Sequence, residues 1–220
     1  GDRSEFLISI ISSILILFSF KRFKIMKWIV ILTISLFTIL QLSFSESLKQ
    51  KFIYNINDNI NQGYFISWKH EAMAKSSYKM FDNNPLFGQG SKMFRVLCDK
   101  EEFLYNIPHR NVGEVSHSCS THPHNIYLEI LAENGLIGFS FIFFIFIFFS
   151  IKIFRHIILV FMNREISYDS STICFMICIY INLIPVIPSM SFFNNWASII
   201  YFLPVGFYLS NIKNINFYKI

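Results

Sequence analysis

The sequence predicts an all-α membrane protein whose helices cross the bilayer about five times. Of the 220 residues, 53% are hydrophobic and only 15% are charged, with 27 Phe. The mean hydropathy is +0.45. This composition is too apolar and too aromatic for an ordinary soluble domain. The net charge of +5 does not indicate nucleic-acid binding, because Lys and Arg lie where membrane topology would place them and form no basic stripe with interleaved aromatics.

Apolar runs of the length that spans a bilayer set the order of the elements. The predicted spans are Phe6–Phe20, Ile25–Phe44, Leu136–Phe154, Thr172–Ser189 and Trp196–Ser210. The third is the strongest, and Pro185 and Pro188 break the chain between the last two. No charged region or small-residue cleavage site precedes the first run, so we do not expect it to be a signal peptide. We expect the chain to be the C-terminal part of a longer protein.

Basic residues in the short connections orient these spans. They form three clusters, one after the first span, one after the third and one after the last: Lys21, Arg22, Lys24, Lys27; Lys152, Arg155, Arg164; Lys213, Lys219. With five spans, all three lie on one side, the cytoplasmic one. The predicted domains are two transmembrane helices over 1–44, a periplasmic loop subdomain over 45–125, and an interfacial helix with three transmembrane helices over 126–220, in a multi-pass protein of the bacterial inner membrane.

The predicted periplasmic loop contains a helix over Ser67–Phe81 with apolar positions on one face. The segment NNPLFGQG should end it, because Asn84 precedes a proline and glycines permit tight backbone geometry. Two loop cysteines, Cys98 and Cys119, are expected to form a disulfide in an oxidising compartment. A zinc site that combines them with His117 and His122 is the alternative, although the spacing matches no zinc pattern. Cys174 and Cys178 lie in an apolar span and are interpreted as small hydrophobes.

The segment HPHNIYLEILAENGLIG places polar, titratable side chains directly before the strongest apolar run. Groups of this kind at a membrane boundary are costly and functional by default. His122 and His124 flank a proline. Glu129 and Glu133 follow on one helix face, where an orienting or structural role is favoured. Gly135 and Gly138 are expected to serve close helix packing or a bend at the membrane surface.

This segment resembles the signature of the O-antigen ligase and polymerase superfamily, in which a His-Asn pair is followed nine residues later by Gly-x-x-Gly. Here the pair is His124-Asn125, and the glycines are Gly135 and Gly138. Two further pieces agree in order: GDRSEFL resembles the family's Arg-containing segment, and HEAMAKSSYKMFDNNPLFGQGSKMF resembles its helix followed by PLFGxG. The resemblance covers most of the chain up to Phe154.

The resemblance implies a partial GT-C-like fold and glycan transfer outside the cell membrane. The donor would be a glycan on undecaprenyl diphosphate, and the acceptor lipid A-core, another lipid-linked repeat unit or a protein side chain. The reaction would be inverting, with no metal and no cofactor. The residue matching the family's base is His124, and the residue matching its diphosphate-binding Arg is Arg3.

The residue chemistry agrees with these roles. Arg neutralises a diphosphate leaving group because its planar fork binds phosphate oxygens bidentately. A sugar hydroxyl needs a base near neutral pH, where His titrates. Asn125 is expected to orient His124 or the acceptor. Further candidates for substrate contact are His122, Arg95 and His70.

Two other functions compete with glycan transfer. A transporter or flippase of lipid-linked glycan would carry charges inside several spans and broken helices, and the predicted spans are nearly free of charge. A non-catalytic membrane subunit would not need the His-Asn and Gly-x-x-Gly arrangement. Ligase and polymerase share these motifs and are not separated.

Overall fold

The computed structural model describes residues 2–21, 24–61, 63, 67–105, 107–108, 115–116, 118–165, 168–185 and 187–217. Within these ranges the side chains of 2–3, 24, 26, 42, 51–52, 107–108, 115–116 and 213–217 are outside the description. The predicted base His124 and the two other histidine candidates, His122 and His70, lie inside it, whereas the side chain of Arg3 lies outside.

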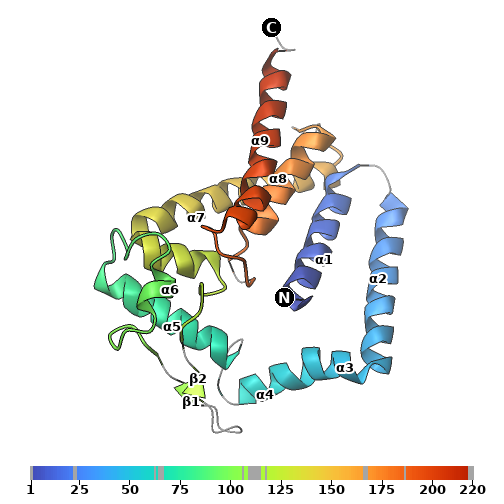
Figure 1. The fold of residues 1–220 in the computed structure, drawn as a ribbon. Helices are drawn as coiled ribbons and strands as arrows, with labels where there is room; N and C mark the ends of the chain where they lie inside the picture. The colour runs from blue at the N-terminus through green and yellow to red at the C-terminus, as the bar shows by residue number, and fades with distance from the viewer. Residues whose placement is uncertain are drawn as a thin grey trace. The chain divides into compact units, whose positions relative to one another are not determined.

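Helices dominate the described chain, in agreement with the predicted all-α class (Figure 1). In chain order the elements are α1 (Asp2–Ser19), α2 (Lys24–Phe44), α3 (Glu46–Lys49), η1 (Gln50–Tyr54, a π-helix), α4 (Asn55–Asn61), α5 (Trp68–Asn83), α6 (Phe94–Leu97), β1 (Ile107–Pro108), β2 (Val115–Ser116), α7 (Ile126–Phe161), α8 (Ser170–Asn182) and α9 (Asn195–Phe217). The two strands form one short antiparallel pair.

The chain divides into two compact units. Unit 1 comprises Gly1–Trp28 and Ser140–Ile220, and unit 2 comprises Ile29–Phe139. This division reflects contacts within the chain and does not bear on which segments cross a membrane. The boundaries expected at 44 and 125 therefore stay predictions.

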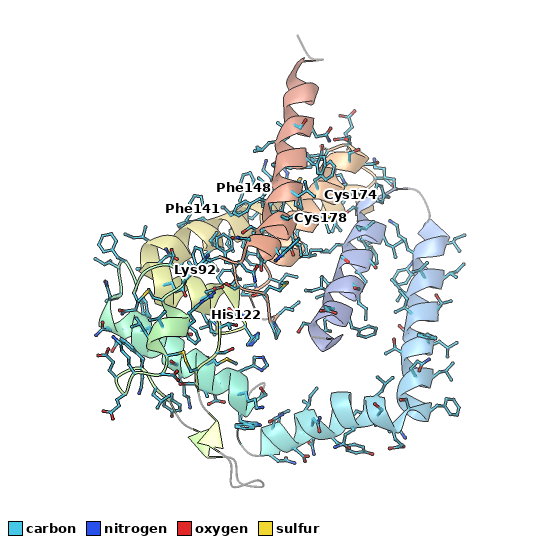
Figure 2. All side chains as sticks on the ribbon, in the orientation of Figure 1. Lys92, His122, Phe141, Phe148, Cys174 and Cys178 are labelled. Carbon is cyan, nitrogen blue, oxygen red and sulfur yellow. A yellow bond between two sulfur atoms is a disulfide. The ribbon has the colours of Figure 1, made fainter. Side chains whose placement is uncertain are left out.

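In unit 1, aromatic side chains join the apolar helices. Helix α8 packs against α9 and α1. Phe146 of α7 stacks on Tyr180 of α8 with ring centroids 5.3 Å apart, and Phe175 of α8 stacks on Phe207 of α9 at 5.4 Å. Other phenylalanines of α7, Phe141 and Phe148 among them, project from the helix and stay exposed (Figure 2). Such an apolar outer surface fits a lipid environment better than water.

One described helix, α7, is long and apolar enough to cross a bilayer, by length and composition alone. Shorter apolar helices occupy Ser4–Ser19, Lys27–Gln41 and Ser170–Asn182, within or close to three other predicted spans. Helix α8 ends at Asn182 rather than at the expected Ser189, because the approach to Pro185 disfavours helical geometry. The number of spans therefore stays a prediction.

Unit 2 is organised around α5, which begins one residue after the predicted start. Ser67 is its N-cap, and its hydroxyl accepts the backbone N–H of His70 at 3.3 Å. The buried face of α5 carries Ala72, Met73, Ser76, Ser77 and Met80. A small core forms where this face meets α6 and the start of α7: Met73, Met80, Phe94, Leu97, Cys98, Phe103 and Ala132.

Candidate active site at the start of helix α7

Asn125 begins helix α7. Its side-chain oxygen accepts the backbone N–H groups of Tyr127 at 3.0 Å and Leu128 at 3.2 Å. These are donors that a helix start otherwise leaves unpaired. The amide was expected to orient His124 or an acceptor, and the structure gives its oxygen a capping role. It thereby fixes the direction in which the chain leaves His124.

His124 has a left-handed backbone conformation with φ of 55°. Few non-glycine residues adopt this region, where strain is common at functional sites. Its ring lies close to two other imidazoles: the centroid of His122 is 4.2 Å away and that of His70 is 5.8 Å away. The structure therefore brings together three histidines that the sequence separates by up to 54 positions.

Hydroxyl groups accompany two of the rings. Ser67 Oγ lies 2.7 Å from Nδ1 of His70, and Thr121 Oγ1 lies 3.0 Å from Nδ1 of His122. Neither hydroxyl was singled out from the sequence. The Ser-x-x-His spacing at the start of α5 could have indicated the contact between Ser67 and His70, because an N-cap side chain reaches the third residue of its helix.

Burial weakens the affinity of the His124 ring for a proton. It lowers the pKa of His124 below its ordinary value of 6.5. Burial and the nearby charge of His124 also lower the pKa of His70. Both rings are therefore mainly neutral at pH 7, the form in which a histidine accepts a proton.

The first part of α7 is held by the PLFGQG segment. At Gly135 the backbone leaves the helical region, with φ of 63° and ψ of −161°, so that α7 is two helices joined at a kink. A kink of this kind leaves the carbonyl groups before it and the N–H groups after it without intrahelical hydrogen-bond partners. Gln89 and Gly90 donate to the carbonyls of Ala132 and Glu133 at 2.9 and 2.8 Å.

The same segment also accepts from the second half of α7. Leu136 N–H donates to the Pro85 carbonyl at 2.8 Å, and Ile137 N–H donates to that of Leu86 at 3.4 Å. The backbones meet so closely that a Cβ at Gly135 would lie 2.4 Å from Leu86, and one at Gly88 would lie 2.4 Å from Glu133. The bend expected at Gly135 is present, and its cause is this contact.

Glu133 anchors a second loop. Its side chain is 2% exposed, and its carboxylate accepts the backbone N–H groups of Phe94 at 3.0 Å and Lys92 at 2.5 Å. Buried carboxylates need such partners. The structural role expected for this residue agrees with the contacts, which fix the start of α6 against α7.

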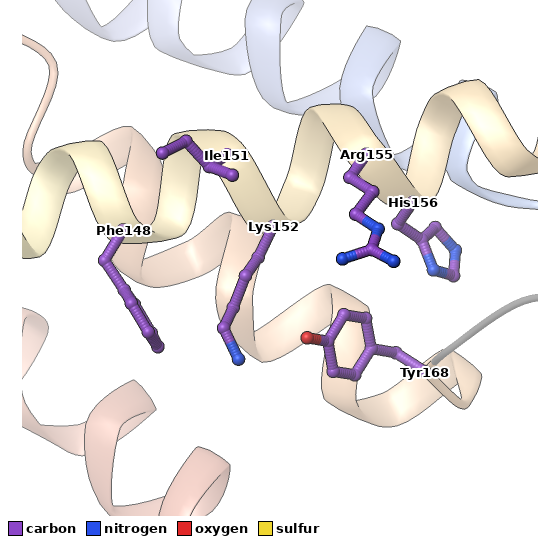
Figure 3. Close-up of a pocket in the computed structure, with 6 residues that line it drawn as sticks. All are labelled: Phe148, Ile151, Lys152, Arg155, His156 and Tyr168. Atoms are coloured by element: carbon purple, nitrogen blue, oxygen red, sulfur yellow. The ribbon is translucent and has the colours of Figure 1, made fainter.

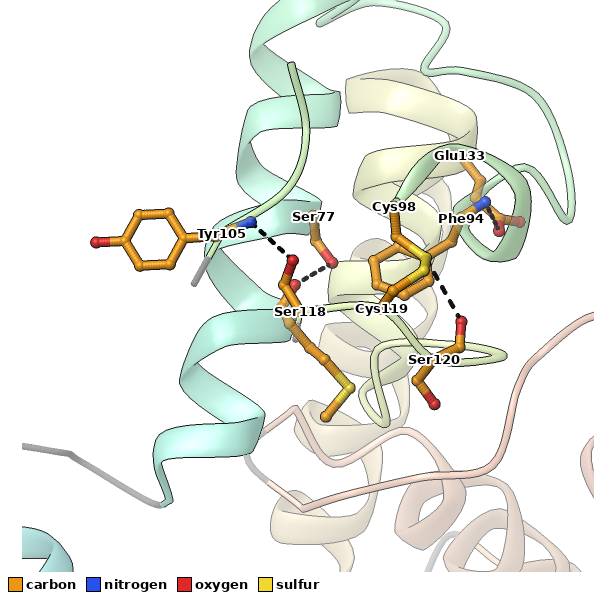
Figure 4. The surroundings of a disulfide bond; sticks show 9 residues. Ser77, Phe94, Cys98, Tyr105, Ser118, Cys119, Ser120 and Glu133 are labelled. Carbon is orange, nitrogen blue, oxygen red and sulfur yellow. Dashed lines mark hydrogen bonds between the residues drawn. A yellow bond between two sulfur atoms is a disulfide. The ribbon is translucent and has the colours of Figure 1, made fainter. Parts of the chain in front are cut away.

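The structure joins Cys98 to Cys119, with Cα atoms 4.9 Å apart (Figure 4). Cys98 follows α6 and packs in the unit 2 core, while Cys119 lies three residues before His122. Next to the bridge, Tyr105 N–H donates to the buried Ser118 hydroxyl at 2.8 Å. Two sulfurs bonded to one another offer no thiolate, so this arrangement does not support the alternative zinc site; His117 lies outside the described residues.

Arg95 is exposed on α6. Its guanidinium acts electrostatically on the Glu133 carboxylate. The site thus combines the imidazole of His124 with two neighbouring imidazoles, next to a helix start that is held by a cap, a kink and a disulfide. The arrangement is suited to proton transfer at a fixed position.

Comparison with known proteins identifies a family whose model matches this sequence. The family model described as O-antigen ligase matches residues 1–145, which include the histidine cluster, the PLFGQG segment and the kink at Gly135. No curated protein and no solved structure matches the chain. With most of its length covered by this match, the chain belongs to the O-antigen ligase family.

Proposed function

We propose that the protein transfers a glycan from undecaprenyl diphosphate to an acceptor hydroxyl, on lipid A-core or on another lipid-linked repeat unit, with His124 as the general base. The family is one of bacterial inner-membrane glycosyltransferases of lipopolysaccharide biosynthesis. The observation that carries the proposal is the position of His124: a partly buried, mainly neutral imidazole held in strained backbone geometry beside two other histidines.

The proposed reaction is a single displacement. The acceptor oxygen forms a bond to the anomeric carbon while the bond from that carbon to the diphosphate oxygen breaks, so the configuration inverts. His124 accepts the proton of the acceptor hydroxyl, and undecaprenyl diphosphate leaves. A base positioned in this way contributes about 10²- to 10⁴-fold to the rate.

Other residues are proposed to bind the substrates. His122 and His70, which lie against the His124 ring, would contact the acceptor or the sugar next to it. Arg95 and Arg3 would neutralise the diphosphate, whose departure does not then need a metal. The buried carboxylate of Glu133 already accepts two backbone N–H groups.

The test uses His124→Asn in the full-length gene, expressed in the native host in place of the wild type. Asn is the appropriate replacement because it tolerates the left-handed backbone at this position, which Ala does not. The matched control is Lys92→Asn, a substitution at another left-handed residue, with φ of 64° and an exposed side chain.

Surface lipopolysaccharide and the pool of undecaprenyl-linked glycan are then measured in the same cells. Loss of capped lipopolysaccharide with accumulation of long lipid-linked chains supports a ligase. Core that carries a single repeat unit supports a polymerase. Unchanged products from His124→Asn at normal protein level, or equal loss from Lys92→Asn, would show that His124 is not the base.

A further inference from the structure

Unit 1 contains a pocket of about 310 Å³ that the glycan-transfer chemistry does not use. It is lined by Phe148, Ile151, Lys152, Arg155 and His156 of α7 and by Tyr168, which precedes α8 (Figure 3). Figure 3 shows Lys152, Arg155 and the Tyr168 hydroxyl converging on the space beside α7. Two cations, an imidazole and a phenol thus share one small volume.

His156 is the buried wall of this pocket, with 1% of its surface exposed. Its Nε2 lies 3.1 Å from the carbonyl oxygen of Ser19, at the end of α1. A carbonyl accepts only, so Nε2 carries the proton and Nδ1 of the neutral ring is an acceptor. Within the described part of the chain, this buried Nδ1 has no hydrogen-bond partner. Buried polar atoms are rarely left so, and a hydroxyl donor from a ligand would satisfy it.

Among the described residues, no carboxylate lies within salt-bridge distance of Lys152 or Arg155. Aromatic faces hold Lys152 instead, with Nζ 4.5 Å from the Phe148 ring centroid and 5.5 Å from that of Tyr168. The pocket therefore presents two cations that no carboxylate of the described residues pairs with.

The remaining wall is apolar and open to the outside. Phe148 is 46% exposed and Ile151 is 63% exposed. Both lie on α7, the helix with the length and composition of a membrane span. The pocket lies near its C-terminal end, in the cluster of basic residues that predicts the cytoplasmic side. Apolar contact beside cations at this level fits a lipid better than a fully soluble molecule.

We propose that this pocket binds a phosphate ester that carries a hydroxyl group, as in the headgroup of an anionic phospholipid such as phosphatidylglycerol. The phosphate accepts hydrogen bonds from Lys152 and Arg155, and the hydroxyl donates to Nδ1 of His156. The acyl chain next to the headgroup lies along Phe148 and Ile151. None of the residues that line this pocket belongs to the proposed glycan-transfer site, and the occupant would stabilise the packing of α1 against α7.

The experiment measures ligand binding to the purified full-length protein. One arm uses nanodiscs of phosphatidylcholine that contain a small fraction of phosphatidylglycerol, with native mass spectrometry of the lipid retained after extraction. A second arm titrates soluble glycerol phosphate into the detergent-solubilised protein. The variants are Arg155→Gln and the double substitution Lys152→Gln with Arg155→Gln. The control is Arg164→Gln, a nearby exposed cation that does not line the pocket.

Phosphatidylglycerol should be retained in preference to phosphatidylcholine. Its affinity should fall about 5-fold in the single variant and about 30-fold in the double variant, while Arg164→Gln leaves it unchanged. Binding of glycerol phosphate with the same dependence on the variants would support a phosphate site with a soluble occupant. The proposal is overturned if neither probe binds, if both variants bind as well as wild type, or if Arg164→Gln weakens binding equally.

Discussion

The contact between the PLFGQG segment and the kink in α7 predicts a large effect for Gly135→Ala. Gly135 has φ of 63°, and an added Cβ would lie 2.4 Å from both the carbonyl carbon and the carbonyl oxygen of Leu86. Backbone atoms on both sides leave no flexible side chain to move away. The substitution should therefore separate the two segments and disturb the helix start that presents His124.

The cost has two parts. An L-residue in the left-handed region costs about 1–2 kcal/mol. Forcing the packed backbones apart costs about 1–3 kcal/mol more, by analogy with overpacked cores. The sum of about 2–5 kcal/mol is a large fraction of the about 5–15 kcal/mol that a typical folded protein has available. Alanine substitutions at two other glycines allow the conformational cost and the packing cost to be measured separately.

Gly63 has φ of 86° and nothing within 4 Å of an added Cβ among the described residues, so Gly63→Ala carries only the conformational cost. Gly206 lies inside α9 with equally open space and no positive φ. Gly206→Ala should be neutral or stabilising by about 0.5–1 kcal/mol. The free energy of unfolding of all three variants is measured by denaturant titration of the protein in detergent. A Gly135→Ala loss no larger than that of Gly63→Ala would refute the proposed backbone contact.

Three further predictions concern the site. Thiol labelling of unreduced protein should leave Cys98 and Cys119 unmodified, and Cys119→Ser should cost about 3 kcal/mol for a bridge of this span; modification of both Cys98 and Cys119, mapped apart from the free Cys174 and Cys178, would exclude the disulfide. Asn125→Ala should lower stability by about 1 kcal/mol through the lost cap, and Asn125→Asp, which still caps, should restore it; failure of Asp to restore stability would count against capping. Because burial lowers the pKa of His124 below 6.5, the acid limb of the pH–rate profile for transfer should be centred below pH 6.5. An acid limb centred above 6.5 would contradict this.

The lowered pKa of His124 also predicts how the free energy of unfolding depends on pH. The direction of this dependence is opposite to that of a histidine paired with an acid, whose pKa is raised. For His124 the unfolded state binds the proton more tightly than the folded state. The stability that depends on its neutral form is complete above the unfolded pKa of about 6.5. It decreases as the pH falls below that value. The same direction holds for His70, whose pKa is also lowered.

Local patterns in the sequence were sufficient for much of the helical framework. The apolar run after Gly135, the amphipathic stretch after Ser67 and the breaking effect of prolines depend on residues that are neighbours along the chain. The bounds of α5 were therefore predictable within two residues, whereas α7 ends at Phe161, seven residues after the expected Phe154. The Asn-Pro step and the glycines of PLFGQG similarly predicted an irregular segment. The chemical character of His124 followed from its residue type and its place before a membrane-spanning run.

Long-range contacts were decided only by the tertiary structure. The sequence did not predict that the side-chain oxygen of Asn125 caps α7, since which donor an amide meets depends on where the backbone turns; the substrate-binding role of Asn125 stays a prediction. The sequence does not predict that Gly88 and Gly135 touch opposing backbones, because the two lie on different segments. His70 joins His124 for the same reason. The membrane-spanning pattern is a property of composition, whereas the histidine cluster and the cationic pocket beside His156 exist only after distant segments pack, since their geometry resides in contacts that no local pattern encodes.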